Sequence, residues 1–402
     1  MNILMISADN KLFEKGSAVQ QRMFKYGKLC DQLIIIVFTK RGFAKIQLAK
    51  NIWLYPTNSY DKLFFICDAY KIVKKEILRG VYTERSECAQ NDAGKSVQSD
   101  NYFLKHARQS FSKRWLITTQ DPFEAGVVGY LTKKRFKIPW QVQIHTDFLN
   151  QYFWQESFKN KIRVILAKWL LPRADSIRVV SDRIKNSLIN KLRISNDNIL
   201  VIPIYVDAEK IKNESPKFNL RQKYSNFDHI ILTVGRLAKE KNHKLLLDGF
   251  SVFVKKYSKS LLVIVGDGSE RKNLEAQIKS LDLTNNVVIE GWQDDLVSYY
   301  KGADLFVFNS KYEGYGMAVI EAMTAGLPVL MTDVGCAYDL PSDMRLGVED
   351  KDVLAKMMEN GLTRDEVRWR LLLFGQNMVK NLPSEEELLM LHKKSWEDSK
   401  FF

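Results

Sequence analysis

The stretch ADLFVFNSKYEGYGMAVIEAMTAGLPVLMTDVG, residues 303–335, combines a strand, a glycine-rich loop, a helix and a second strand. Residues 304–309 are an apolar run typical of a buried strand, and residues 317–325 have helical spacing with good helix formers. Glu313 lies on the loop and Glu321 lies about one turn into the helix. Because ligands of open α/β sheets bind at the carboxyl ends of strands, this unit predicts a ligand site at the loop.

The start of the predicted helix offers backbone donors to such a ligand. Gly314 and Gly316 interrupt the strand, and the amides of Tyr315, Gly316 and Met317 lie at or near the helix N-terminus. Free amides at that position suit phosphate oxygens or polar hydroxyls. The alternative is a pair of ordinary surface glutamates on a helix, and two further loops of the same kind argue against it.

The first of these loops is GRLAKEKN, residues 235–242, which follows the apolar strand 229–234 and precedes a helical pattern. Arg236 and Lys241 flank the turn, so a guanidinium and an ammonium are placed to converge on one diphosphate. The alternative is a pair of solvated loop cations. The second loop, VGDGS at 265–269, follows another apolar strand, and Gly266 permits close backbone approach or a tight turn.

The motifs GRLxxEKN, GDG, EGYGMAVIE and AGLPV occur in this order over residues 230–340. Together they resemble the donor domain of the family 4 retaining glycosyltransferases (glycosyltransferase group 1), and the likeness extends more loosely over the N-terminal half. The resemblance implies an α/β fold of GT-B architecture, with two Rossmann-like, doubly wound parallel-sheet domains that face a central cleft. It also implies metal-independent transfer of a sugar, with retention, from a UDP-sugar or GDP-sugar to a hydroxyl of a carbohydrate or lipid-linked acceptor. Such a reaction belongs to cell-envelope glycan, glycolipid or polysaccharide synthesis, and no cofactor or metal is expected.

The resemblance also assigns roles to particular residues. Arg236 and Lys241 neutralise the donor diphosphate, Glu313 contacts sugar hydroxyls and Glu321 holds the ribose. The catalytic residues that it implies are His145, Arg236, Lys241 and Glu313. The donor-binding residues that it implies are Gly16, Arg236, Lys241, Gly266, Glu313, Gly314, Tyr315, Gly316, Met317 and Glu321.

The N-terminal half carries weaker signals. His145 ends the predicted strand WQVQI and Gly16 precedes a helix expected to start near residue 17 or 18. By resemblance, Gly16 lies near the donor phosphates and His145 supports positive charge at the anomeric carbon. Asp147 is a further candidate, for an acceptor hydroxyl. The alternatives are an ordinary helix start and a structural histidine.

A chain of 402 residues exceeds what one core usually supports, so we expect two domains. Strands and helices alternate in both halves, which favours parallel sheets covered by helices. The predicted strands lie near residues 2–7, 33–38, 51–55, 115–119, 140–145, 177–181, 199–202, 229–234, 261–265, 287–290, 304–309 and 328–332. The polar segment 203–224 is the predicted linker. The expected divisions are an acceptor-binding domain (1–205), a donor domain (206–380) and a last helix (381–402), capped by Ser384, which by resemblance returns to the first domain.

The composition limits where such a protein works. No apolar run approaches the roughly 20 residues of a membrane span, and MNILMISADN lacks the basic region of a signal peptide. Four scattered cysteines without a CxxC pair predict reduced thiols and no zinc site. We therefore expect a cytoplasmic protein. The polar segment 83–101 is expected to be a mobile loop.

The formal net charge is +14, and one stretch concentrates it. Residues 157–193 contain ten basic and two acidic residues beside Trp154, Phe158 and Trp169. This mixture suits peripheral binding to the anionic inner face of a membrane. The alternative is a solvated basic face over core residues. No nucleic-acid motif accompanies the charge, so nucleic acid is not expected as a partner. A sugar-nucleotide epimerase of similar fold and a basic polyanion-binding module remain the alternative functions.

Overall fold

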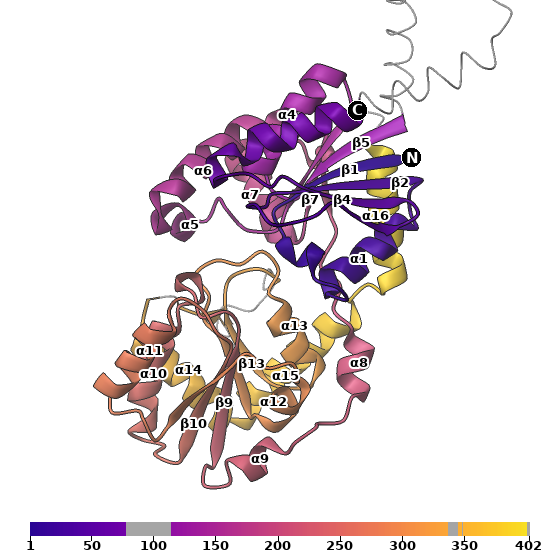
Figure 1. The fold of residues 1–402 in the computed structure, drawn as a ribbon. Coiled ribbons are helices and arrows are strands. Elements are labelled where there is room, and N and C mark those ends of the chain that lie inside the picture. Colours follow the sequence, from indigo (N-terminus) through magenta and orange to yellow (C-terminus); the bar gives the residue numbers. More distant parts are fainter. Residues whose placement is uncertain (78–113, 337–344, 348, 400–402) are drawn as a thin grey trace, which may run out of the picture.

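The protein consists of two α/β domains, each built on its own sheet (Figure 1). The computed structural model describes residues 1–77, 114–336, 345–347 and 349–399. The predicted mobile loop, 83–101, lies outside the described residues. The α/β fold expected from the alternation of strands and helices is confirmed.

The first sheet has eight strands in the order β3-β4-β2-β1-β5-β6-β7-β8. Its strands are β1 (Asn2–Ser7), β2 (Gln32–Val37), β3 (Ile46–Ala49), β4 (Ile52–Pro56), β5 (Trp115–Thr119), β6 (Trp140–Ile144), β7 (Ser176–Val179) and β8 (Ile199–Val201). All pairs are parallel except β3 with β4. The seven strands predicted in this half are confirmed. β3 was not predicted, because it is a partly exposed edge strand without an apolar run.

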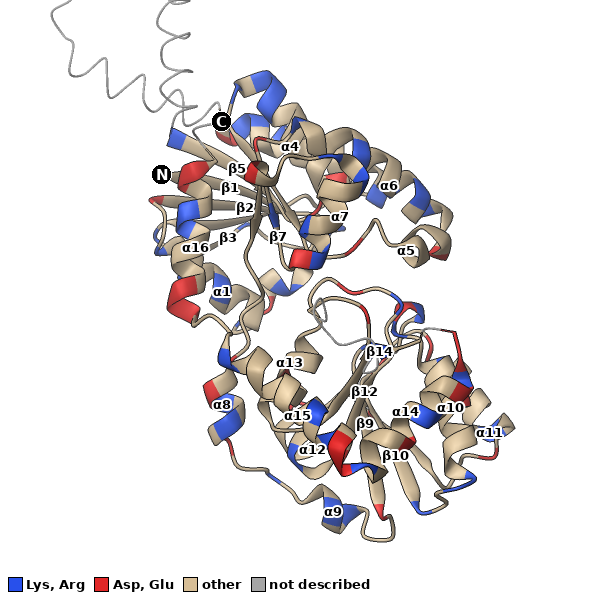
Figure 2. Ribbon diagram, turned by 180° about the vertical axis from the view of Figure 1, so that it is seen from behind, with Lys and Arg blue, Asp and Glu red and all other residues tan. Residues whose placement is uncertain are grey.

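Helices cover this sheet on both faces, as both faces of an all-apolar parallel strand must be covered. They are α1 (Ala18–Gly27), α4 (Glu124–Phe136), α5 (Gln151–Glu156), α6 (Phe158–Leu170) and α7 (Asp182–Leu192), with short 3-10 turns at Asn10–Phe13, Lys62–Phe64, Leu171–Arg173 and Asn196–Asn198. Serines cap three of these helices. The side chains of Ser17, Ser157 and Ser181 accept bonds from amides in the first turns of α1, α6 and α7. Figure 2 shows Lys and Arg residues on α6.

The second sheet has six strands in the order β11-β10-β9-β12-β13-β14, all parallel. Its strands are β9 (His229–Val234), β10 (Ser260–Val265), β11 (Val287–Gly291), β12 (Leu305–Phe308), β13 (Val329–Thr332) and β14 (Arg345–Leu346). Its helices are α10 (His243–Val254), α11 (Arg271–Ser280), α12 (Val297–Gly302), α13 (Met317–Thr324), α14 (Lys351–Thr363) and α15 (Asp365–Lys380), with a 3-10 turn at Lys239–Lys241. The five predicted strands are confirmed, whereas the two-residue β14 is too short to leave a sequence pattern.

The chain crosses between the domains twice. The first crossing is the polar segment 203–224, which contains two short helices, α8 (Ala208–Asn213) and α9 (Leu220–Lys223). The second leads from α15 into α16 (Glu385–Asp398), which lies beside α1 (Figure 1). The predicted cap of α16 is confirmed, since Ser384 and Glu387 form a reciprocal capping box.

The helix α16 belongs physically to the first domain. Its Trp396 is fully buried in a core cluster with residues of β1, β2 and α1. Its His392 Nε2 lies 2.9 Å from the hydroxyl of Tyr26, and Gln141 Nε2 on β6 donates to Ser399 Oγ just beyond the helix at 3.1 Å. Within the described ranges, none of the helices is long and apolar enough to span a bilayer.

This packing predicts that α16 stabilises the first domain. Trp396→Ala removes a large buried side chain and is expected to lower the free energy of unfolding by about 3–5 kcal/mol. The exposed Met390 on the same helix provides the control, and Met390→Ala should change it by less than about 0.5 kcal/mol. Denaturant unfolding, followed by far-UV circular dichroism of the backbone, measures the free energy of unfolding of both variants. Equal effects of the two substitutions would contradict the docking of α16.

Candidate active site

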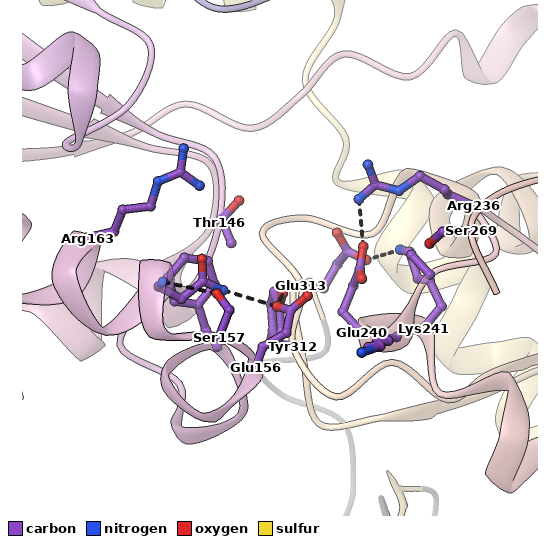
Figure 3. Close-up of a pocket in the computed structure, with 14 residues that line it drawn as sticks. Thr146, Glu156, Ser157, Arg163, Arg236, Glu240, Lys241, Ser269, Tyr312 and Glu313 are labelled. Atoms are coloured by element: carbon purple, nitrogen blue, oxygen red, sulfur yellow. Dashed lines mark hydrogen bonds and ion pairs between the residues drawn. The ribbon is translucent and has the colours of Figure 1, made fainter. Parts of the chain in front are cut away.

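The carboxyl ends of the two sheets face each other, and a cavity of about 650 Å³ lies between the domains (Figure 3). The first domain contributes residues of α5, α6 and the end of β6. The second contributes the loops after β9, β10 and β12. The lining residues are Thr146, Phe153, Glu156, Ser157, Asn160, Arg163, Arg236, Ala238, Lys239, Glu240, Lys241, Ser269, Tyr312 and Glu313. The structure therefore brings Arg236, Lys241 and Glu313 together at one cavity.

The two predicted phosphate ligands of this cavity, Arg236 and Lys241, are paired with carboxylates. Arg236 Nη2 donates to Glu240 Oε1 at 2.6 Å, and Lys241 Nζ forms an ion pair with Glu313 (Figure 3). Lys241 is mostly buried, and its ammonium lies 4.8 Å from the ring centroid of Phe308. The Arg236 side chain is 72% exposed, so it can move toward a ligand at little cost. No role was predicted for Glu240, although it lies inside the GRLAKEKN motif.

The loops after β9 and β10 depend on glycine where they touch. Gly266 has φ of 141°, and a Cβ there would overlap the carbonyl oxygen of Gly235. Leu237 N donates to the carbonyl of Asp267 at 3.0 Å, which locks the two loops together. The sequence left open whether Gly266 serves a tight turn or a close backbone approach. The structure shows a close approach, and its partner is the neighbouring loop at Gly235. Gly266 is not among the residues that line the cavity.

The loop 312–316 is the main contact between the domains at the cleft. A Cβ on Gly314 would overlap the carbonyl oxygen of His145, so no larger residue fits there. Ser181 Oγ donates to the carbonyl of Gly314 at 2.9 Å, and the Tyr312 hydroxyl donates to Glu156. The loop thus separates two cavities, with Glu313 lining the first.

The second cavity, of about 540 Å³, lies on the other side of this loop. Its lining residues are Asp9, Ala18, Gln21, Arg22, Lys25, Tyr26, Gln120, Gln143, His145, Arg178, Pro203, Ile204, Tyr205, Met317, Glu385, Leu388, Leu389 and His392. His145 and Met317 are the only residues of the predicted site that line it. The structure therefore places the side chain of His145 in a different cavity from those of Arg236, Lys241 and Glu313.

Hydrogen bonds determine the proton position on His145. Its Nε2 lies 3.3 Å from Gln143 Oε1, which also accepts from Arg178 Nη1 at 2.9 Å. A guanidinium only donates, so the Gln143 atom facing both groups is the oxygen, and His145 Nε2 carries the hydrogen. Burial, together with the charges of Arg178 and Arg22, lowers the pKa of His145 to about 3. The imidazole is therefore neutral at physiological pH, with Nδ1 unprotonated.

The remaining predicted residues lie around these cavities without lining either. Gly316 has φ of 89° and directly precedes α13, and Tyr315 is buried with its carbonyl bonded to Cys336 N at 2.8 Å. Gly16 has φ of 79° just before the Ser17 cap of α1. These positive φ values favour glycine at both positions.

Glu321 and Asp147 are the two carboxylates of the predicted site that line neither cavity. Glu321 accepts a hydrogen bond from the Tyr300 hydroxyl at 2.8 Å, and burial raises its pKa. Asp147 is buried, its Oδ1 has no hydrogen-bond partner within the described parts of the chain, and burial raises its pKa against the charges of Lys191 and Arg183. Neither placement puts the side chain at the wall of the cleft in this conformation.

Two stretches of the chain match known family descriptions. Residues 216–348 match the glycosyl transferases group 1, and residues 83–210 match the glycosyltransferase family 4. The chain belongs to this glycosyltransferase family. The expected resemblance is confirmed, and the loops that carry Arg236, Lys241, Gly266, Glu313 and the α13 N-terminus all fall inside the group 1 segment.

Relatives and solved structures agree with this assignment. Mannosylfructose-phosphate synthase of Agrobacterium fabrum is 26% identical over 65% of this chain and 63% of its own length. Alpha-monoglucosyldiacylglycerol synthase of Streptococcus pneumoniae is 28% identical over 58% of this chain and 55% of its own length. The chain thus matches little more than half the length of these relatives.

Among solved structures, HepE of Anabaena, crystallised with UDP and glucose, superposes over 100% of both chains with a TM-score of 0.68 and 18% identity. A likeness at that identity shows the fold, and the predicted GT-B architecture is confirmed. Within the part of the chain that the structure describes, no group of three or more His, Cys, Asp or Glu side chains is placed to hold a metal ion.

The buried histidines predict how stability depends on pH. Burial lowers the pKa of His145 to about 3 and of His243 to about 4, and that of His392 falls well below its ordinary value. The unfolded chain titrates near 6.5, so below that pH it binds protons that the folded protein does not. The free energy of unfolding should therefore fall steadily as pH drops from about 6.5 to 4.

Urea midpoints at pH 7, 6 and 5 measure this loss. His243→Gln should reduce the difference between pH 7 and pH 5, because one buried imidazole no longer titrates. A midpoint that stays constant over this range in the parent protein would contradict the pKa directions. An unchanged difference in the variant would show that His243 contributes nothing to it.

Proposed function

We propose that this protein transfers a sugar from a nucleoside diphosphate sugar to a hydroxyl acceptor, with retention of anomeric configuration and without a metal ion. The observation that carries the proposal is the convergence of Arg236, Lys241 and Glu313 at one cavity between the domains. Membership of a glycosyltransferase family supplies the reaction class. UDP-sugar is the first candidate donor, because the Anabaena neighbour was crystallised with UDP and glucose, and GDP-sugar is the second.

The ion pair between Lys241 and Glu313 suggests how a donor is held. Both groups are pre-positioned in a partly buried site, each neutralising the other. A bound donor exchanges this pair for two intermolecular contacts: Lys241 to diphosphate oxygens and Glu313 to sugar hydroxyls. Arg236 adds a guanidinium from the exposed edge of the cavity. In this arrangement two cations meet the charge that develops on the leaving diphosphate, which is the role a divalent metal plays in other transferases.

The proposed step breaks the bond between the anomeric carbon and the β-phosphate oxygen and forms a bond from that carbon to the acceptor oxygen. The acceptor proton passes to the departing diphosphate on the same face of the sugar, so charge and atoms balance. A neutral His145 fits this chemistry. An imidazolium at that place would repel the positive charge that develops on the sugar, whereas neutral imidazole and backbone carbonyl dipoles do not.

The alternative functions are less well supported. A sugar-nucleotide epimerase needs only the donor side of the cleft, and a polyanion-binding module needs no cleft at all. The family assignment and the second cavity beside His145 favour a transferase over both. The deciding assay measures release of nucleoside diphosphate from UDP-sugars and GDP-sugars in the presence of EDTA. Release only with added acceptor supports the proposal, whereas an epimerised donor or dependence on Mg²⁺ would refute the corresponding part of it.

The phosphate role of the cations predicts a specific loss of activity. Lys241→Gln and Arg236→Gln should each lower kcat/KM, because diphosphate charge is left uncompensated. The expected loss of transition-state stabilisation is about 2–4 kcal/mol for each variant. Lys272→Gln on α11 removes an exposed cation outside the cavity and serves as the matched control. Thermal shifts with UDP check binding directly, since a ligand of the folded state raises stability in proportion to RT ln(1 + [L]/Kd). Turnover equal to that of the parent protein in both cavity variants would contradict the proposed contacts of Arg236 and Lys241 with the diphosphate.

A lipid-linked acceptor is proposed on the surface of α6. Four apolar side chains on it are 46% to 77% exposed and recur at helical spacing: Phe158, Ile162, Ile165 and Trp169. Exposed lysines at 159, 161 and 168 flank this apolar stripe. An amphipathic helix of this kind suits the interface of an anionic membrane. The similarity to the alpha-monoglucosyldiacylglycerol synthase of Streptococcus pneumoniae, whose name states a glycolipid product, is in keeping with it.

The basic stretch 157–193 is less uniform than its sequence suggested. Arg178 is buried, Arg163 forms a bidentate contact with Glu124 at 2.9 to 3.2 Å, and Arg183 pairs with Asp333 of the other domain. These three arginines do not face a membrane. The alternative was a solvated basic face whose apolar residues belong to the core. It does not account for the three arginines that are buried or paired, nor for the exposed apolar residues of α6.

The membrane proposal predicts a loss of vesicle binding on charge reversal. Lys161→Glu together with Lys168→Glu should weaken binding to anionic vesicles by at least about 2 kcal/mol, roughly 1 kcal/mol per charge. The matched control reverses two exposed lysines of α11 in the other domain, Lys272→Glu and Lys279→Glu. Cosedimentation with anionic and zwitterionic vesicles measures both proteins. Equal binding of the α6 variant and the control would remove the membrane from the proposal.

A further inference from the structure

Arg178 is a buried cation without a carboxylate partner. It lies on β7, is 4% exposed, and donates only to neutral groups: Gln143 Oε1 and the carbonyl of Ile202, both at 2.9 Å. Its Nε has no hydrogen-bond partner among the residues that the structure describes. Among the residues that the structure describes, no carboxylate lies within ion-pair distance of its guanidinium. Burying an unpaired charge is costly, so a buried arginine normally has an anion beside it.

Arg178 remains positively charged at neutral pH. Burial, and to a smaller extent the charge of Arg22, lowers the pKa of Arg178 to about 10, which leaves it protonated under physiological conditions. The same positive surroundings help depress the pKa values of His145 and His392. The empty protein therefore holds a positive potential at this point that its own carboxylates do not cancel.

Arg178 lines the second cavity, where a second arginine joins it. Arg22 projects from the exposed face of α1 into the same cavity and forms no ion pair within the described ranges. Among the other charged side chains of the lining, Lys25 is paired with Glu385, and Asp9 accepts a hydrogen bond from the backbone Lys11 N at 3.0 Å. His392 also lines the cavity, and its buried Nδ1 has no hydrogen-bond partner in the described part of the chain. Arginine is the side chain best suited to bind phosphate, through paired N–H donors, and two arginines line this one cavity.

We propose that this second cavity binds the phosphate group of a phosphate-bearing acceptor. The proposal rests on the proposed transferase function, which it deepens by naming the acceptor class. The donor diphosphate is assigned to Arg236 and Lys241, on the other side of the loop 312–316. A phosphate at Arg178 is therefore additional to the donor. His145, which the family resemblance places beside the anomeric carbon, lines the same cavity as Arg178.

Titration calorimetry with inorganic phosphate as the probe, at constant ionic strength and with UDP saturating the donor site, tests this proposal. Arg178→Gln and Arg22→Gln should each raise the phosphate Kd at least fivefold. Arg135→Gln on α4 removes an exposed arginine outside the cavity and should leave the Kd unchanged. Because Arg22 is exposed, its variant should fold even if the Arg178 variant does not.

The outcomes separate this proposal from the transferase proposal. Equal phosphate affinity in the Arg22 variant, the control and the parent would overturn the anion site. Phosphate that binds only when UDP is absent would assign the anion to the donor and overturn the acceptor class. If UDP fails to bind while phosphate binding still depends on Arg22, the anion site stands and the donor proposal fails. UDP binding without phosphate binding gives the reverse result.

Discussion

The whole cleft depends on one backbone contact, the approach of Gly314 to the carbonyl oxygen of His145. The two residues are 169 positions apart: His145 directly follows β6 of the first sheet, and Gly314 lies in the loop that follows β12 of the second. A Cβ at position 314 would overlap that oxygen, so glycine is required for the domains to meet at this distance. The contact places Glu313 in one cavity and His145 in the other. The positions of Glu313 and His145 in separate cavities thus depend on glycine at position 314.

Electrostatics then distinguishes the two cavities. In the first, the two proposed phosphate ligands already have carboxylate partners: Lys241 pairs with Glu313 and Arg236 with Glu240. A ligand there must compete with an internal ion pair, which favours a ligand that supplies both an anion and hydroxyl groups. In the second, Arg178 has only neutral acceptors. An anion entering it displaces no internal partner. The two sites are therefore built for different ligands, although both attract negative charge.

Much of the fold could be predicted from the sequence, because parallel strands buried on both faces read as apolar runs such as LIIIV in β2 and LLVIV in β10. The site could be predicted only where a loop follows such a strand, as with Arg236 and Glu313. Arg178 shows why the rest could not. In a strand covered on both faces, alternation carries no information about which side is buried, so its positive charge was read as part of a surface stretch. Pairings such as Lys241 with Glu313 join residues 72 positions apart, and no local pattern encodes them.

The two connections between the domains differ in kind, and this difference bears on how the cleft opens. On the side of α16 the contact is apolar and closed, with Trp396 in the core of the first domain. Across the cleft the contacts are mostly polar: Arg183 with Asp333, Tyr152 with Glu349 at 2.8 Å, and Ser181 with the Gly314 carbonyl. Polar contacts at a partly solvated interface contribute little net free energy, because water replaces them when they separate. The first domain and α16 therefore form one body, and a rotation of the second domain away from it would break mainly polar contacts of this kind. Such a rotation would also part Gly314 from the His145 carbonyl, so the glycine contact that brings the loop of Glu313 against His145 would be lost as the cleft opens.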